Sequence, residues 1–134
     1  MAKTVLIVED SPHYASTLEI ALECIKGVGV AHAQSGCEAL RFLEGPRGAE
    51  VCAMVTDLQM PLMDGYELIE RIRATPAWHR LPIVVVSGAA DPSSRDRIYR
   101  LGADAFFPKP YSPSAVRTKI EELIGEKGSG EADG

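Results

Sequence analysis

Five polar residues stand directly after short apolar runs of the chain, and their types suit phosphoryl chemistry. In chain order they are Glu9, Asp10, Asp57, Ser87 and Lys109. A carboxylate can attack phosphorus or bind a hard cation, while an ammonium and a hydroxyl can donate hydrogen bonds to phosphoryl oxygens. The set contains no histidine or cysteine, so its oxygen ligands favour Mg²⁺ over zinc or copper.

The apolar runs that precede these residues read as strands, and amphipathic segments separate them. The predicted strands are residues 4–8, 28–33, 51–56, 83–86 and 103–107. Helices are predicted between the strands and after the last one, because apolar residues recur there at helical spacing. Leu18 and Leu22 show this spacing in the first helix, and Ile120 and Ile124 show it in the last.

Alternating strands and helices predict a parallel sheet that is covered by helices on both faces. The ligand site of such a sheet lies outside the carboxyl ends of its strands. The five polar residues are therefore expected to converge at one edge. Carboxylates about 4 Å apart repel by several kcal/mol at an effective dielectric near 20, so the cluster needs a cation or raised pKa values.

The bulk properties indicate one globular domain. The chain has 134 residues, 46% of them hydrophobic, and a formal net charge of −5, which disfavours direct binding of nucleic acid. It lacks an apolar run long enough for membrane insertion. Cys24, Cys37 and Cys52 fit no disulfide or zinc pattern and are expected to be buried, reduced thiols of a cytoplasmic protein. Residues 125–134 are rich in Gly, Ser, Glu and Lys and are predicted to form a disordered tail after a domain of residues 1–124.

The sequence resembles a response-regulator receiver domain over residues 3–124. The motifs that carry the resemblance are Glu9-Asp10, Asp57, the Met-Pro-Leu-Met-Asp-Gly loop of residues 60–65, Ser87-Gly88 and Lys109-Pro110. The resemblance implies a flavodoxin-like, doubly wound fold, with a five-stranded parallel sheet in the order 2-1-3-4-5 and five helices. It also implies a signalling phosphoacceptor, not an enzyme, that assists its own phosphoryl transfer and autodephosphorylation.

The resemblance assigns roles to individual residues. Asp57 is expected to accept the phosphoryl group from a phosphohistidine on a sensor histidine kinase or a histidine phosphotransfer protein. Asp10 and Asp57 are expected to bind Mg²⁺ directly, together with the backbone carbonyl of Gln59, while Glu9 acts mainly through water. Lys109 is expected to pair with the phosphoryl oxygens.

The resemblance further implies a conformational switch. Ser87 is expected to close onto the phosphoryl group, after which Phe106 turns inward. The Lys109-Pro110 peptide is expected to be cis. Gln59 and Ala89 resemble the pair of positions that tunes hydrolysis of the aspartyl phosphate. The output is expected through a face made by the fourth helix, fifth strand and fifth helix, which contacts a downstream protein target, and the chain is expected to be a monomer or a weak homodimer.

Other interpretations of these residues remain open at the sequence level. Acidic residues at strand ends also cap helices or form turns. A pseudo-receiver would keep the fold and act as a phosphorylation-independent docking module. A phosphatase with an aspartyl-phosphate intermediate would need a second acid where this chain has Gln59. A flavin carrier of similar topology would need a Gly- and Ser/Thr-rich loop where the chain has Glu9 and Asp10.

Overall fold

The fold is taken from a computed structural model, which describes residues 3–88 and 92–133 and side chains as far as Gly125. Ala89 and Asp91, which is the predicted start of a helix, lie outside the described residues. The elements in chain order are β1 (Lys3–Val8), α1 (Pro12–Glu23), β2 (Val28–Ala33), α2 (Gly36–Glu44), the short 3₁₀ helix η1 (Gly48–Glu50), β3 (Val51–Asp57), α3 (Gly65–Ala74), β4 (Ile83–Ser87), α4 (Pro92–Leu101), β5 (Ala105–Pro108) and α5 (Pro113–Asp133).

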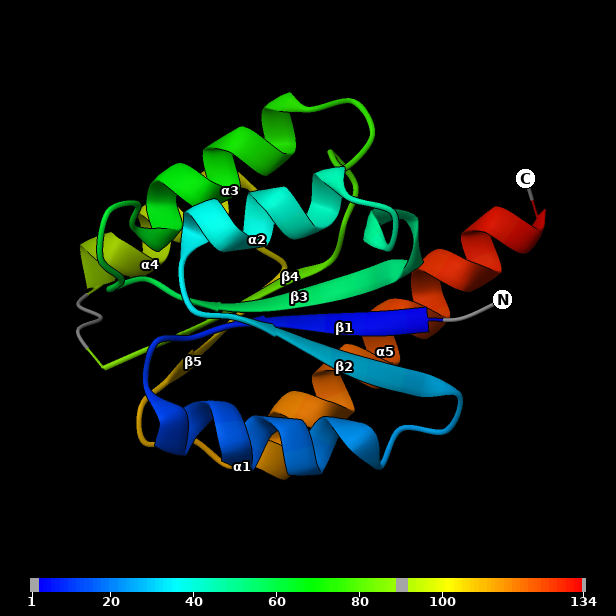
Figure 1. Cartoon of the computed structure of the whole chain (residues 1–134), viewed down its shortest axis with the longest axis horizontal. Coiled ribbons are helices and arrows are strands. Elements are labelled where there is room, and N and C mark those ends of the chain that lie inside the picture. Colours follow the sequence, from blue (N-terminus) through cyan, green and yellow to red (C-terminus); the bar gives the residue numbers. More distant parts are fainter. Residues whose placement is uncertain (1–2, 89–91, 134) are drawn as a thin grey trace.

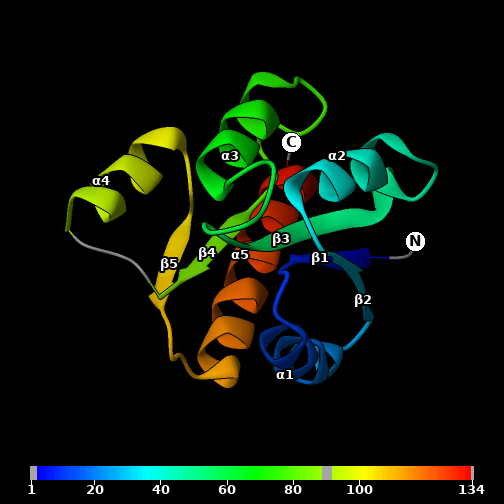
Figure 2. The same ribbon diagram turned by 60° about the vertical axis from the view of Figure 1, so that its left-hand side comes forward.

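The five strands form one parallel sheet in the order β2-β1-β3-β4-β5, as the sequence predicts. Helices α1 and α5 cover one face of the sheet, and α2, α3 and α4 cover the other (Figures 1 and 2). The register aligns Val8 with Thr56, Asp57 with Val86, and Ser87 with Pro108. The carboxyl ends of β1, β3, β4 and β5 therefore meet at one edge.

Two apolar layers fix this arrangement, one on each face of the sheet. Leu6, Met54 and Val85 face α2, α3 and α4, while Val5, Val55 and Val84 face α1 and α5. Strand β4, between β3 and β5, is buried along its whole length because its apolar, β-branched residues are covered from both sides. Phe106 and Phe107 pack into opposite layers, because successive side chains of a strand point to opposite faces of the sheet.

The fifth strand begins at Ala105, two positions later than the sequence predicts. Asp104 is engaged in the preceding turn instead. Its carboxylate accepts a hydrogen bond from the backbone N–H of Ile83 at 2.8 Å and pairs with Arg73 at 3.2 Å. Arg73 also donates to the carbonyl of Gly102, so a side-chain network fixes the approach to β5.

The last helix also differs from the sequence prediction. The structure continues α5 to Asp133, whereas the sequence predicts that the helix ends at Ile124 and that a disordered tail follows. No proline interrupts the sequence after Pro113, and Glu and Lys in this stretch are good helix formers. The division into a domain of residues 1–124 and a tail of residues 125–134 stays a prediction.

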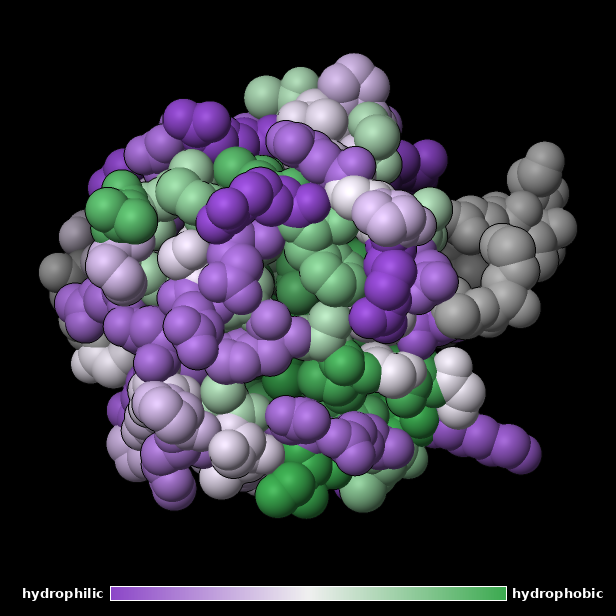
Figure 3. Space-filling view, in the orientation of Figure 1, coloured by the Kyte–Doolittle hydropathy of each residue, from purple (hydrophilic) through white to green (hydrophobic). Residues whose placement is uncertain are grey.

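The surface seen in Figure 3 is mostly hydrophilic, with apolar area over β2 and α1. Ile20 of α1 is 69% exposed, and Val28 and Val30 of β2 are half-buried. Cys24 is exposed at the end of α1, so its predicted burial is wrong, whereas Cys37 is half-buried. In the part of the chain that the structure describes, no helix is both long and apolar enough to cross a membrane.

Gly65 is the first residue of α3, and its position requires the absence of a side chain. A Cβ atom there would lie 2.5 Å from the carbonyl oxygen of Asp57 and 2.8 Å from Cα of Leu58. We therefore expect Gly65→Ala to lower the free energy of unfolding by about 1–3 kcal/mol in urea titrations, because backbone must move. Gly29→Ala is the control, since the atom nearest to its Cβ would be the carbonyl oxygen of Lys3, 3.9 Å away. Equal stability of Gly65→Ala and the wild type would contradict this packing.

Candidate phosphoacceptor site

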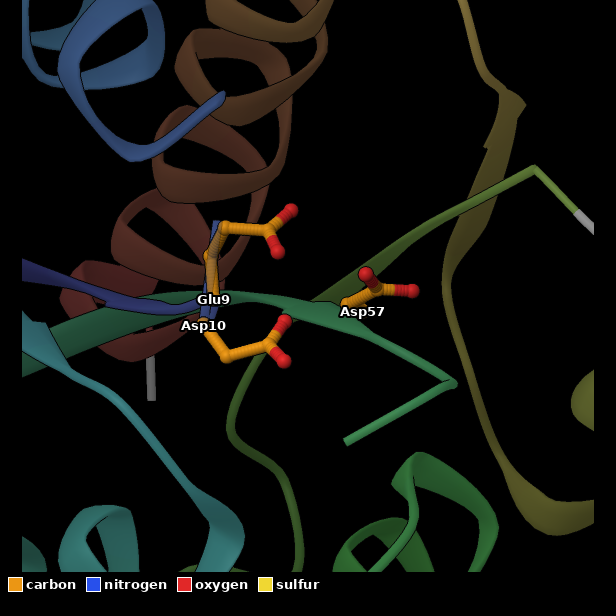
Figure 4. Close-up of side chains that lie close together, drawn as sticks. All are labelled: Glu9, Asp10 and Asp57. Carbon is orange, nitrogen blue, oxygen red and sulfur yellow. The ribbon is translucent and has the colours of Figure 1, made fainter. Parts of the chain in front are cut away.

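The predicted site residues come together where four strands end. Asp57 and Ser87 are the last residues of β3 and β4. Glu9 and Asp10 follow β1 directly, and Lys109 follows β5. Figure 4 shows the carboxylates of the first loop and of β3 turned toward the same space.

The three carboxylates form a compact oxygen cluster. Glu9, Asp10 and Asp57 each offer an oxygen atom, and these atoms lie within 4.8 Å of one another. Glu9 is 1% exposed and Asp57 is 4% exposed, whereas Asp10 is open to solvent. The cluster thus has two buried members and one member that water or an ion can reach.

Lys109 compensates part of this negative charge. Its Nζ donates to Oε1 of Glu9 and to Oδ2 of Asp57, both at 2.8 Å. Burial by itself lowers the pKa of the Lys109 ammonium, but the hydrogen bonds and charges of Asp57 and Glu9 outweigh burial and raise its pKa above the ordinary value. Lys109 is therefore a fixed cation between the two buried carboxylates.

Glu9 is held on several sides. Its Oε2 accepts a hydrogen bond from the backbone N–H of Ser11 at 3.1 Å. Nε2 of His32 lies 2.7 Å from the carbonyl oxygen of Glu9, so this nitrogen is the donor. Burial raises the pKa of the Glu9 carboxyl, the hydrogen bonds from Lys109 and Ser11 oppose this, and the negative charge of Asp57 adds to the rise.

The loop after β3 shapes the other side of the site. The backbone N–H of Gln59 donates to Oδ1 of Asp57 at 3.2 Å. Leu62 has a positive φ of 71° inside a three-residue turn closed by a 2.8 Å hydrogen bond from Met63 N–H to the Pro61 carbonyl. The turn leaves Leu62 93% exposed and places Met63 in the core.

A hollow of about 400 Å³ opens beside the carboxylate cluster. Its lining residues come from the loop after β1, the loop after β3, the start of α3 and the end of β4: Asp10, Leu58, Gln59, Met60, Pro61, Asp64, Tyr66 and Ser87. Ser87 is fully buried. The hollow therefore brings a buried hydroxyl and an accessible carboxylate to one space.

Phe106, the predicted switch residue, is half-buried and packs against the layer beneath α3 and α4. The guanidinium of Arg95 from α4 lies 5.0 Å from its ring centroid. The Lys109-Pro110 peptide is cis, as expected. Ala89, the predicted companion of Gln59, lies outside the described residues.

Three aromatic or imidazole side chains around the site were not predicted to have a role. His32 bonds to the Glu9 carbonyl, Tyr14 lies under the Lys109 ammonium, and Tyr111 stacks on Tyr14. For Tyr14 and Tyr111, the position in the sequence could have indicated that they lie near the site. Tyr14 lies in the first turn of the helix that follows the acidic pair, and Tyr111 is two residues after Lys109.

The raised pKa of Glu9 has a consequence for stability in the absence of divalent metal. The folded chain holds the Glu9 proton to a higher pH than the unfolded chain, whose value is near 4.5. Between these two pKa values the folded state binds more protons, so this group makes stability fall as the pH rises through that window.

We expect a carbon-detected NMR titration in EDTA to give the Glu9 carboxyl a pKa above 4.5. Lys109→Met should raise this pKa further, because it removes a hydrogen bond and a positive charge that favour the ionised form. Lys119→Met is the control, since Lys119 pairs with Glu122 on α5. A Glu9 pKa that stays constant in Lys109→Met would refute the coupling.

Comparisons with known proteins agree with this geometry. A family model for the response regulator receiver domain matches residues 5–121. A chemotaxis protein CheY homolog from Campylobacter jejuni is 29% identical over 126 residues, which cover 94% of this chain and 95% of the relative.

Solved structures show the same likeness. A CheY-like response regulator receiver domain protein from Methanospirillum hungatei has a TM-score of 0.84 and 27% identity, with all of both chains covered. The receiver domain of a sensor histidine kinase from Pseudomonas aeruginosa, with magnesium in its active-site cleft, has a TM-score of 0.79 and 26% identity, covering 93% of this chain and 99% of that one. The chain therefore belongs to the response-regulator receiver domain family, whose members are typically signalling phosphoacceptors that work with histidine kinases.

Proposed function

We propose that Asp57 accepts a phosphoryl group from a phosphohistidine on a sensor histidine kinase or a histidine phosphotransfer protein. The observation that carries the proposal is the buried Asp57 carboxylate, which Lys109 contacts at 2.8 Å at the edge where β1, β3, β4 and β5 end. Glu9 and Asp10 complete the acidic cluster beside it.

The proposed transfer needs little from the protein besides alignment. An oxygen of Asp57 bonds to phosphorus while the phosphorus–nitrogen bond of the donor breaks, and the electron pair leaves with the imidazole nitrogen. The product is an aspartyl phosphate. Lys109 and the Ser87 hydroxyl are the donors that would stabilise the phosphoryl oxygens, because Lys109 contacts Asp57 and Ser87 ends β4, the strand that pairs with β3.

The donor set also fits Mg²⁺. Asp10 and Asp57 are proposed as direct ligands with the Gln59 carbonyl, and Glu9 as a contributor through water. All of these groups offer the oxygen atoms that this ion prefers. When bound, Mg²⁺ would neutralise negative charge between the carboxylates and the phosphoryl group. The magnesium in the related Pseudomonas aeruginosa domain supports this assignment.

The proposed output is a change in protein contacts. Ser87 would close on the phosphoryl group, Phe106 would turn inward, and the face of α4, β5 and α5 would be recognised by a downstream protein target. Autodephosphorylation would then reset the domain. We propose a cytoplasmic protein, monomeric or weakly dimeric, that neither inserts into a membrane nor binds nucleic acid directly.

Acetyl phosphate provides a direct test of the acceptor chemistry. We expect intact-protein mass spectrometry to show a gain of one phosphoryl group that requires Mg²⁺ and that Asp57→Asn abolishes. Asp64→Asn is the matched control, because Asp64 lines the same hollow and caps α3, where asparagine also caps well. It should still accept phosphate.

Rapid hydrolysis can hide the adduct, so beryllofluoride binding is a second readout. Its addition should shift the NMR signals of Ser87 and Phe106 in the wild type. If the wild type shows no mass gain and none of these shifts, the proposal is refuted. The domain would then be a docking module that acts without phosphorylation.

Metal binding is tested separately by thermal unfolding. We expect millimolar MgCl₂ to raise the melting temperature by about 2–5 °C relative to NaCl of the same ionic strength, because the ion binds only the folded carboxylate cluster. Asp10→Asn should remove most of this rise, whereas Asp64→Asn should keep it. An unchanged response in Asp10→Asn would show that Mg²⁺ acts elsewhere.

A further inference from the structure

The Lys109 ammonium has an aromatic neighbour in addition to its two carboxylate partners. Two of its three N–H groups are directed to Glu9 and Asp57, each at 2.8 Å. The ring of Tyr14 lies against Nζ, with its centroid 4.1 Å away. This distance is well inside the range of a cation–π contact.

Tyr14 is itself held in place. It comes from the first turn of α1, and its ring packs on Tyr111 at a centroid distance of 5.5 Å. His13 meets the ring of Tyr14 edge-on at 5.6 Å. Tyr111 packs against the apolar layer beneath α1 and α5, and its buried hydroxyl has no hydrogen-bond partner among the described residues. The Tyr14 ring therefore contacts both the ammonium and a second aromatic ring.

A neutral ring suits this place better than a third hydrogen-bond acceptor would. Another carboxylate would add charge to a cluster that already contains three of them. A π face attracts the cation without prescribing one direction for an N–H bond. Lys109 can thus exchange a carboxylate oxygen of Asp57 for a phosphoryl oxygen while its contact with the ring persists.

We propose that Tyr14 is a positioning residue that holds the Lys109 ammonium for phosphoryl transfer to Asp57. This inference rests on the proposed function. It assigns Tyr14 no contact with the reacting atoms, because the ring acts through Nζ of Lys109. The aromatic ring, not the hydroxyl, is the group required.

Substitutions at Tyr14 separate these two parts of the side chain. With acetyl phosphate below saturation and Mg²⁺ present, Tyr14→Leu should lower the phosphorylation rate by about two- to tenfold. Tyr14→Phe keeps the ring and should stay within about twofold of the wild type. A Tyr14→Leu rate equal to that of the wild type would overturn the inference.

A double-mutant cycle distinguishes positioning from a general structural effect. In a Lys109→Met background, Tyr14→Leu should cause no further loss of rate, because the cation on which the ring acts is gone. An equal loss in both backgrounds would overturn the proposal. Thermal unfolding monitored by circular dichroism confirms that each variant is folded under the assay conditions.

The contact can also be observed without phosphorylation. The ring current of Tyr14 should shift the Hε protons of Lys109 upfield in the wild type and in Tyr14→Phe, and Tyr14→Leu should remove most of this shift. An unshifted Lys109 in the wild type would refute the contact. If the wild type takes no phosphate at all, the proposed function fails, whereas a normal rate in Tyr14→Leu removes only the role of Tyr14.

Discussion

The architecture of the site depends on one ammonium placed between two buried carboxylates. The parallel sheet brings Glu9 and Asp57 to the same edge, where their charges repel. Their carboxylate oxygens lie within 4.8 Å of each other, and two unit charges at that distance repel by about 3 kcal/mol at an effective dielectric of 20. Lys109, which directly follows β5, forms ion pairs with both carboxylates. The same cation therefore ties the end of β1 to the end of β3 and fixes where the chain passes from β5 into α5.

The single positive charge of Lys109 balances only part of the negative charge of the three carboxylates. Glu9 is buried, and its two carboxylate oxygens accept hydrogen bonds from the Lys109 ammonium and the Ser11 N–H. Asp10 carries the remaining charge on the accessible side and lines the hollow. The two adjacent acids therefore differ in environment. Glu9 binds the buried Lys109 ammonium, whereas Asp10 is exposed to solvent.

Much of this arrangement follows from local sequence pattern. Buried apolar runs and the polar residues that end them identify the strands, and the alternation with helices places those ends together. The order of the strands came from the family resemblance, which the structure confirms. Contacts between distant side chains could not be predicted in this way. The ring of Tyr14 under Lys109, His32 against the Glu9 carbonyl, and Asp104 bonded to Ile83 all depend on how separate elements pack.

Helix α4, which belongs to the proposed output face, buries fewer residues than the neighbouring α3. Its only buried residue is Ile98, whereas α3 buries Leu68, Ile69 and Ile72 besides its first glycine. Two guanidinium–ring contacts add to this attachment: Arg95 meets Phe106 of β5, and Arg97 meets Tyr66 of α3.

Such contacts are worth about 0.5–1 kcal/mol each when exposed. A change of a few kcal/mol in the hollow would therefore exceed the contribution of either contact. Tyr66 lines that hollow, and the guanidinium of Arg97 lies 4.0 Å from the centroid of its ring. Direct contacts thus connect the hollow, through Tyr66, to Arg97 of α4, and Tyr66 also packs against the apolar layer beneath α3 and α4.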